Sequence, residues 1–310
     1  MIEVFIIVVT YNSLPWIETC LRSCGDYKIV IVDNNSSDQT ISHIQSHFPK
    51  VHLLPQSKNL GFGQANNLGI SYALKQGAEY IFLLNQDAYL QEGCIDILIE
   101  VHKKNTSYGI LSPIHLNGQG NRLDRNFSNY VNYAANPDFY SDFVLKKPLK
   151  EIYEVPFVNA AGWLLSRDIL EKVGGFDPIF FHYGEDDNFC QRARFHGFKI
   201  GVVPFAFLFH DRAERPKKEI KHASDAYFEV MKKKFKVKYA NINEENLNNL
   251  YKLLKRRQKY RQIALVKLNF SNANYLKKEI DLLKQIIPEI EKSRQLALKK
   301  GGSLYLNVNG

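Results

Sequence analysis

The chain has 310 residues, of which 45% are hydrophobic and 24% charged, and its formal net charge at pH 7 is +9. This length accommodates one large α/β core, or a core of about 200 residues with a smaller appendage. No uncharged apolar run reaches about 18 residues, so we expect no transmembrane helix. The four cysteines lack zinc-site spacing and no secretory signal accompanies them, so we expect free thiols in a cytoplasmic protein.

The charge is unevenly distributed along the chain. Residues 1–211 hold 17 Lys and Arg against 22 Asp and Glu, whereas residues 212–310 hold 24 against 10. The change falls in a polar stretch without apolar periodicity, which is typical of a loop or linker. We therefore predict a catalytic domain over residues 1–215 and a basic helical extension over residues 216–310.

In the first domain, apolar runs alternate with stretches of helical periodicity. The apolar runs predict strands over residues 4–9, 28–32, 51–54 and 80–84. The helical spacing predicts helices from about Pro15, from about Asp38 and over residues 64–75. Strands that alternate with helices of this length indicate crossover connections and a mainly parallel, Rossmann-like sheet.

Polar residues follow three of these strands. Thr10-Tyr11-Asn12 follows the first strand, Asp33 ends the second, and Asn85-Gln86-Asp87 follows the fourth. Ligands of open α/β sheets bind outside the carboxyl ends of the strands, so these residues are expected along one ligand-binding edge. An aromatic ring with a carboxylate can hold a nucleobase, and a carboxylate such as Asp87 suits a divalent cation. Polar turns and helix caps are the structural alternatives.

A loop over residues 59–67 contains Gly61 and the amides Asn59 and Asn66 just before and within a predicted helix. Glycine permits close backbone approach, so we expect this loop to face a ligand. The first strand is not followed by the glycines of a dinucleotide site, and no Walker A sequence occurs.

A second group of acids, Glu185 to Asp187, follows an aromatic run and opens a predicted helix that closes at Gly197. Clustered carboxylates near apolar surface need a cation or a proton to accept. The structural alternative is that they complement the helix dipole. His210 ends a further apolar run, which makes it a candidate metal ligand beside these acids.

These motifs together resemble the family 2 glycosyltransferases. The matching segments, in order, are residues 7–12, 32–38, 59–67, 83–88, 174–177 and 185–186. The resemblance covers residues 1 to about 215. It implies the GT-A fold and an inverting transfer of a sugar from a nucleotide diphosphate donor, with Mn²⁺ or Mg²⁺ as cofactor.

The resemblance also implies roles for individual residues. Asp186 is expected to be the general base, and Asp87 and His210 are expected to hold the metal. Glu185 and Trp163 are expected to contact the acceptor, although Trp163 suits a core position equally well. The residues expected to bind the nucleotide sugar are Thr10, Tyr11, Asn12, Asp33, Asn59, Gly61, Asn66, Asn85 and Gln86.

The sequence departs from the family pattern at two positions. Asn85 replaces the first acid of the DxD motif, and Asn188 stands where a second acid often follows the base. Such variants resemble the rhamnosyltransferase-like branch, so we favour deoxythymidine diphosphate rhamnose as donor. The acceptor is expected to be a glycan or lipid-linked hydroxyl in bacterial-type surface polysaccharide synthesis.

Two other functions stay open at this point. A glycoside hydrolase also uses paired carboxylates, but it does not need strand-end motifs for a nucleotide and a metal. A catalytically inactive GT-A scaffold that binds nucleotide or glycan is the second alternative, and the loss of an acid at Asn85 motivates it.

The basic extension carries apolar stripes at helical spacing, at residues 247–254 and 276–287, which are expected to dock on the core or to form a homodimer. Its charge suits either a solvated face or anionic lipid at the inner face of a membrane. No groove-reading motif accompanies it, so nucleic acid is not expected. Basic residues between residues 212 and 218 are expected to close over the diphosphate or to form a solvated linker.

Overall fold

The computed structural model describes residues 2–211 and 219–308. Its strands are β1 Val4–Thr10, β2 Lys28–Asp33, β3 His52–Pro55, β4 Tyr80–Asn85, β5 Ala88–Leu90, β6 Tyr108–Asn117, β7 Tyr153–Glu154, β8 Gly162–Ser166 and β9 Lys199–His210. The helices of the first domain are α1 Ile17–Ser23, α2 Thr40–His47, α3 Phe62–Lys75, α4 Cys94–Lys104, the short 3₁₀ helix Phe127–Asn129, α5 Pro137–Val144, α6 Arg167–Val173 and α7 Glu185–Phe195. The extension contains α8 Asp225–Tyr239, α9 Leu247–Val266 and α10 Phe270–Ala297.

All of these strands belong to one sheet, in the order β3-β2-β1-β4-β8-β6-β9-β5, with β7 paired to β9. β1 to β4 are parallel to one another, as the alternation of strands and helices predicts. The other half is mixed, because β8 runs antiparallel to both β4 and β6, and β5 and β7 run antiparallel to β9. The sheet is therefore a mixed α/β sheet, parallel only in the half formed by β1 to β4 and at the β6–β9 pair.

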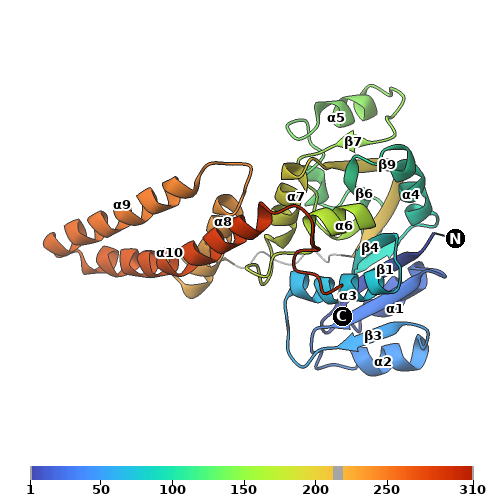
Figure 1. Cartoon of the computed structure of the whole chain (residues 1–310), viewed down its shortest axis with the longest axis horizontal. Helices are drawn as coiled ribbons and strands as arrows, with labels where there is room; N and C mark the ends of the chain where they lie inside the picture. The colour runs from blue at the N-terminus through green and yellow to red at the C-terminus, as the bar shows by residue number, and fades with distance from the viewer. Residues whose placement is uncertain (1, 212–218, 309–310) are drawn as a thin grey trace.

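Side chains of the central strands are buried on both faces of the sheet. In β1, Phe5 and Ile7 belong to one apolar cluster, and Val4, Ile6 and Val8 belong to the other. This alternation follows from the two-residue period of a strand, and burial on both sides explains why the run is continuously apolar. Helices cover both faces, as Figure 1 shows.

The strand register brings the polar strand ends together. Thr10 lies opposite Asp33 across the β1–β2 pair, and Val9 lies opposite Asn85 across the β1–β4 pair. At the far edge of the sheet, His210 lies opposite Ala88, directly after Asp87. The carboxyl end of β9 thus reaches the turn that follows β4.

The extension is helical, as predicted. α9 and α10 lie side by side and project away from the sheet (Figure 1). They share an apolar cluster that includes Leu250, Leu283 and Ile287, and Tyr239 of α8 joins it. The predicted boundary at residues 215 and 216 lies outside the described residues.

The extension is attached to the first domain by specific hydrogen bonds. Lys236 donates to the carbonyl of Ile179 at 2.7 Å, and Ser293 donates to Asp177 at 2.5 Å. After α10 the chain returns to the sheet, where the N–H of Gly175 donates to the carbonyl of Leu304 at 2.7 Å. Among the described helices, none is both long and apolar enough to cross a membrane.

Candidate active site

Asp33 organises the strand-end loops from a fully buried position. Its carboxylate accepts from the hydroxyl of Thr10 at 2.8 Å and from the N–H and hydroxyl of Ser36 at 2.8 and 2.6 Å. Thr10 is also fully buried. These two residues, predicted to contact the nucleoside, instead contact each other and Ser36 in this structure, so they shape the edge on which a ligand would lie.

Tyr11 presents its side chain at that edge and is 49% exposed. Gln86 joins the ends of β1 and β4, because its side chain accepts from the N–H of Tyr11 at 2.8 Å and donates to its carbonyl at 3.3 Å. Asn12 accepts from the N–H of Ser37 at 2.8 Å. The predicted residues Tyr11, Asn12 and Gln86 therefore come together, with the Tyr11 ring open to a flat ligand such as a nucleobase.

The loop before α3 is held by side-chain amides. Asn34 donates to the carbonyl of Gly61 at 3.1 Å, and the N–H of Gly61 donates to Asn59 at 2.8 Å. Gly61 has a φ of +80°, which favours glycine, and a Cβ there would lie 1.9 Å from the carbonyl oxygen of Phe181. The donor-side loop therefore touches the segment that leads into the acids of α7.

Asn66 does not reach this edge. It is 1% exposed, and its side chain donates within α3 to the carbonyl of Phe62 at 3.0 Å. Because the position lies one turn into a buried helix face, the amide serves the helix and offers no group to a nucleotide sugar in this structure.

Asp87 and His210 face each other. His210 Nε2 lies 3.4 Å from Asp87 Oδ1 and 3.4 Å from the side-chain nitrogen of Asn85. On the other side of the ring, His210 Nδ1 lies 3.8 Å from Asp124 Oδ2. The sequence motifs did not identify Asp124, since it lies in an irregular segment with no recognisable pattern around it.

The two predicted metal ligands supply one carboxylate oxygen and one imidazole nitrogen. Within the described ranges, no group of three or more His, Cys, Asp or Glu side chains could hold a metal ion. Mg²⁺ and similar cations are often held by one or two protein ligands plus substrate phosphates and water. The donor set therefore fits a divalent cation that arrives with a diphosphate, and it does not form a complete protein cage.

The second acidic group opens α7. Glu185 is 3% exposed, and within the described part of the chain its Oε2 has no hydrogen-bond partner. Burial and the neighbouring charge of Asp186 raise the pKa of Glu185 to about 7. The same two causes raise the pKa of Asp187 to about 7. Glu185 is thus enclosed, whereas Asp186 and Asp187 are half-buried.

Asp186 is the central acid of the three. Burial raises its pKa above the ordinary value, and backbone N–H groups oppose that shift, including the N–H of Asp187 at 2.9 Å from its Oδ1. A carboxylate with a raised pKa and partial exposure can accept a proton from a hydroxyl that reaches it. The geometry allows Asp186 to act as a base.

Asn188, at the position where the family resemblance leads us to expect an acid, belongs to the core. It is fully buried and accepts from Arg192 Nε at 2.9 Å. Arg192 also donates to the carbonyls of Val173, at 2.7 Å, and Gly175. The asparagine therefore completes a network that joins α7 to the end of α6.

The predicted contact of Trp163 with the acceptor requires a correction, because the Trp163 side chain is not exposed. It is fully buried, and its ring packs against Phe176 and Phe189 with centroid distances of 6.0 and 5.6 Å. A sugar cannot stack on it without displacing these rings. Trp163 is therefore a core residue, which was the alternative interpretation of its sequence position. Helices cover both faces of strand β8, on which it lies.

Two exposed aromatic residues lie next to the acids instead. Phe181 is 60% exposed and Tyr183 is 62% exposed, and Lys233 of α8 lies 4.4 Å from the centroid of the Tyr183 ring. The aromatic run before Glu185 was the sequence signal for them. The basic residues predicted to close over the diphosphate, Arg212, Arg215, Lys217 and Lys218, lie outside the described residues.

A mixed α/β sheet with a nucleotide-type strand-end edge, beside a group of carboxylates at a helix start, defines the class of GT-A nucleotide-sugar transferases. The chain belongs to glycosyl transferase family 2, whose family model matches residues 5–174. The resemblance that the sequence motifs carry is confirmed, including the rhamnosyltransferase-like branch.

Three curated proteins are similar to this chain. The hexosyltransferase Agl10 of low-salt glycan biosynthesis in Haloferax volcanii is 31% identical over 68% of this chain and 67% of its own length. The dTDP-rhamnosyl transferase RfbF of Shigella flexneri is 27% identical over 67% of this chain and 69% of its own. The N-acetylglucosaminyl-diphospho-decaprenol L-rhamnosyltransferase of Mycobacterium tuberculosis is 25% identical over 67% and 76%.

Among solved structures, S. aureus TarS residues 1–349 in complex with UDP-GlcNAc has the same fold, with a TM-score of 0.53. The superposition covers 95% of this chain and 88% of that one, at 18% identity. The GT-A architecture is therefore established for this chain, and the protein is a glycosyltransferase.

Proposed function

We propose that this glycosyltransferase moves rhamnose from deoxythymidine diphosphate rhamnose to a hydroxyl of a glycan or lipid-linked acceptor, with inversion at the anomeric carbon. The observation that carries the proposal is the direct contact between the donor-side loop at Gly61 and the segment of Phe181 that leads to Asp186. This contact supports a proton acceptor close to the edge where the strand ends would hold the nucleotide. Surface polysaccharide synthesis is the process that this reaction would serve.

Asp186 is the proposed general base. It would take the proton of the acceptor hydroxyl while that oxygen attacks the anomeric carbon from the side opposite the leaving nucleotide diphosphate. A single displacement of this kind inverts the configuration. Burial raises the pKa of Asp186 above its ordinary value, which makes it a stronger base than an exposed aspartate.

Asp87 and His210 are the proposed metal ligands. A bound Mn²⁺ or Mg²⁺ supplies charge neutralisation for the departing diphosphate. Asn85 adds no negative charge beside them, so the donor phosphates are expected to contribute much of the metal's binding. Tyr11 would stack on the nucleobase, with Gln86 holding its backbone in place.

The names of relatives support the choice of donor and acceptor. RfbF is named for dTDP-rhamnose, and the mycobacterial enzyme is named for a decaprenol diphosphate acceptor and L-rhamnose.

The enclosed Glu185, with one unpartnered oxygen, suits a role in holding the base or an acceptor hydroxyl after a small rearrangement.

A donor screen tests the proposal. Thermal shift with deoxythymidine, uridine and guanosine diphosphate sugars in Mn²⁺ should give the largest stabilisation with deoxythymidine diphosphate rhamnose, since a ligand stabilises only the state that it binds. Product analysis by mass spectrometry with lipid-linked acceptors then measures transfer. Metal-dependent nucleotide binding without turnover on any acceptor would favour the inactive scaffold instead.

A further inference from the structure

The hairpin of α9 and α10 ends in exposed apolar side chains. Figure 1 shows the two helices joined at the end that lies farthest from the sheet. At this turn Val266 is 84% exposed, Leu268 71% and Phe270 59%, and Ile263 and Leu265 are also exposed. We call residues 263–270 the hairpin tip. Such a contiguous apolar patch, rimmed by polar residues, marks an interaction surface rather than a solvated end.

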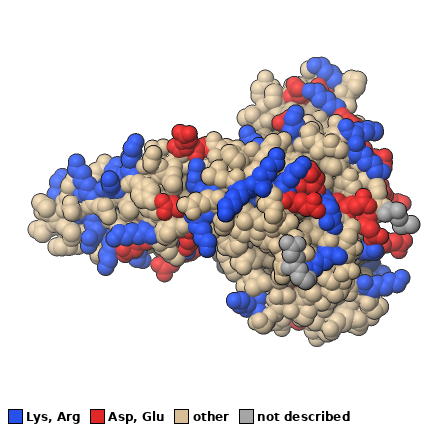
Figure 2. All heavy atoms as spheres, in the orientation of Figure 1, with Lys and Arg blue, Asp and Glu red and all other residues tan. Residues whose placement is uncertain are grey.

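The charge around the hairpin tip has one sign. Residues 246–278 contain nine Lys and Arg and no Asp or Glu. The next acid, Glu279, is 1% exposed and pairs with Arg257 at 2.7 Å. The exposed cations of this stretch are Lys252, Lys255, Arg256, Lys259, Lys267, Lys277 and Lys278, of which Lys278 lies 3.3 Å from Asp225 of α8. In Figure 2 the far end of the hairpin shows neither acidic nor basic atoms; Lys and Arg follow along its length, and Asp and Glu join them closer to the sheet domain.

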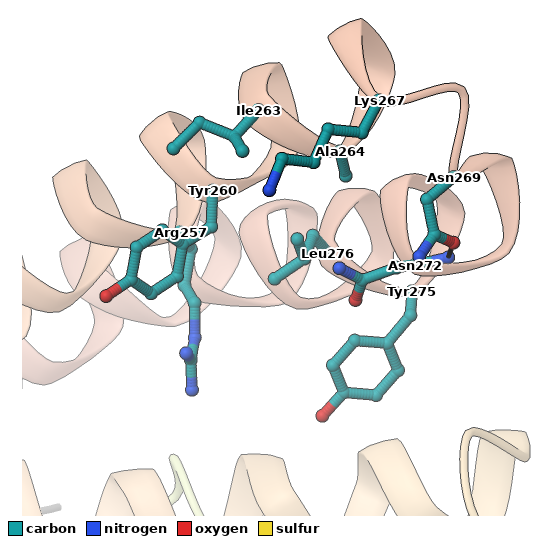
Figure 3. Close-up of a pocket in the computed structure, with 9 residues that line it drawn as sticks. All are labelled: Arg257, Tyr260, Ile263, Ala264, Lys267, Asn269, Asn272, Tyr275 and Leu276. Carbon is teal, nitrogen blue, oxygen red and sulfur yellow. Dashed lines mark hydrogen bonds between the residues drawn. The ribbon is translucent and has the colours of Figure 1, made fainter.

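A groove of about 390 Å³ lies between the two helices near the tip. Arg257 and Lys267 line it from the α9 side, and Asn272 and Tyr275 line it from α10. Figure 3 shows the Arg257 guanidinium and the Tyr275 hydroxyl extending to the same side of the hairpin. Arg257 pairs with Glu279 at 2.7 Å, and the Tyr275 hydroxyl lies 3.4 Å from that of Tyr227, so these two groups hold the helices together, whereas Lys267 is exposed beside the apolar tip.

We propose that the hairpin tip docks on an anionic phospholipid bilayer. Residues 265–270 enter the boundary between headgroups and acyl chains, and the surrounding cations lie at the level of the phosphates. Burial of the apolar side chains and attraction to anionic lipid act together in such interfacial binding. The inference goes beyond the proposed function and does not depend on it, because binding to vesicles is measured without donor or acceptor.

A second copy of the chain is the competing occupant. A symmetric dimer through the tip brings each patch against its own copy, so the cations of both chains meet with no exposed acid between residues 246 and 278 to offset them. An anionic bilayer offsets this charge. The charge pattern therefore favours the lipid surface.

Co-sedimentation of the full chain with vesicles tests the proposal. Vesicles that contain phosphatidylglycerol should bind roughly tenfold more protein than pure phosphatidylcholine vesicles, and high salt should reduce the difference. A triple variant in which Val266, Leu268 and Phe270 are changed to Ser should bind vesicles roughly tenfold less. It should remain folded, because all three side chains are mostly exposed.

A matched pair of charge variants tests the contribution of the cations. The first triple variant, with Lys255, Arg256 and Lys259 each changed to Gln, should bind vesicles several-fold more weakly. The control triple variant changes Lys50, Lys146 and Lys147 to Gln. It removes the same charge from exposed positions of the sheet domain and should leave vesicle binding unchanged. Equal loss in both triple variants would mean that net charge alone drives binding, which overturns the role of the hairpin.

A probe in the otherwise unchanged chain keeps the test independent of variant stability. Leu268→Trp should shift its fluorescence to shorter wavelength with phosphatidylglycerol vesicles and not with phosphatidylcholine vesicles. An unshifted spectrum in vesicle-bound protein overturns insertion of the tip. A different result would assign the tip to a contact between copies of the chain. In that case the protein does not bind vesicles, and light scattering shows a dimer that becomes a monomer in the Ser triple variant.

Discussion

Gly61 and Phe181 touch through their backbones: a Cβ at residue 61 would lie 1.9 Å from the Phe181 carbonyl oxygen. One residue belongs to the loop before α3 and the other to the segment before α7. Their contact couples the loop expected to face the donor to the carboxylates expected to handle the proton. Any side chain at position 61 must therefore move one of these segments.

The change Gly61→Ala should lower kcat/KM for sugar transfer at least tenfold and destabilise the fold by about 1–3 kcal/mol, the usual range for a strained backbone position. Gly77→Ala is the matched control, because Gly77 has a φ of +87° with nothing within 4 Å of its Cβ position. It carries the backbone strain without the collision. If the two variants lose equal activity, the contact with Phe181 has no functional part.

Asp186→Asn should reduce transfer by about 10²–10⁴-fold, because loss of a general base removes a contribution of that size. Nucleotide diphosphate binding, measured by calorimetry, should stay unchanged. Asp187→Asn removes the neighbouring half-buried acid and should reduce transfer less than tenfold. A larger loss from Asp187→Asn than from Asp186→Asn would move the base to Asp187.

Asp124→Asn should weaken Mn²⁺ binding in the presence of deoxythymidine diphosphate by about 10–100-fold, the usual effect of losing a carboxylate behind a metal-binding histidine. The reason is that Asp124 lies beside Nδ1 of His210, whereas Nε2 faces Asp87. Calorimetric titration with Mn²⁺ measures the affinity directly.

His210→Ala should weaken the same Mn²⁺ affinity at least as much as Asp124→Asn. Asp211→Asn serves as the control, since Asp211 accepts from the hydroxyl of Tyr89 at 3.1 Å instead. Unchanged Mn²⁺ affinity in His210→Ala would remove the histidine from the metal site.

Glu185 should make stability depend on pH. Its folded pKa is raised from 4.5 to about 7, so between these values the folded state binds more protons than the unfolded state. The free energy of unfolding should therefore fall as pH rises from about 4.5 to about 7, by roughly 3 kcal/mol from this group. Urea unfolding at pH 5 and pH 8 measures the difference.

Glu185→Gln should remove its own part of that dependence, since glutamine cannot titrate, and should leave the part that Asp187 contributes over the same pH range. Relative to the wild type, the variant should gain stability at pH 8 and show little gain at pH 5. Glu171→Gln, an exposed change on α6, controls for the loss of one acid. If the slope in Glu185→Gln equals that of the wild type, Glu185 makes no contribution and the pH dependence comes from Asp187 or another group.

Much of the parallel half of the sheet could be predicted from local pattern. Each of the first four strands lies within a residue or two of its apolar run, and α3 begins at Phe62 beside the predicted Gln64. These elements depend on periodicity over a few residues. The mixed half could not be predicted in the same way, because the direction of β8 between β4 and β6 depends on a long connection whose path has no local signal.

The candidate site shows the same division. Strand-end position alone was enough to select Asp87 and His210, and the register brings these two side chains together. Position was not enough for Trp163 or Asn66, which are buried, because the exposure of a side chain depends on what packs over it from distant parts of the chain. Phe181 and Tyr183 were visible only as an aromatic run until the fold left them exposed.

The sequence by itself determined which chemical groups this glycosyltransferase has at its strand ends and helix start, since those groups follow directly from local apolar runs and their polar ends. Only the tertiary structure decided which of them meet. Strand register and helix packing are set by contacts between residues far apart in the chain, and these contacts bring Gly61 to Phe181 and Asp124 to His210 while they bury Trp163.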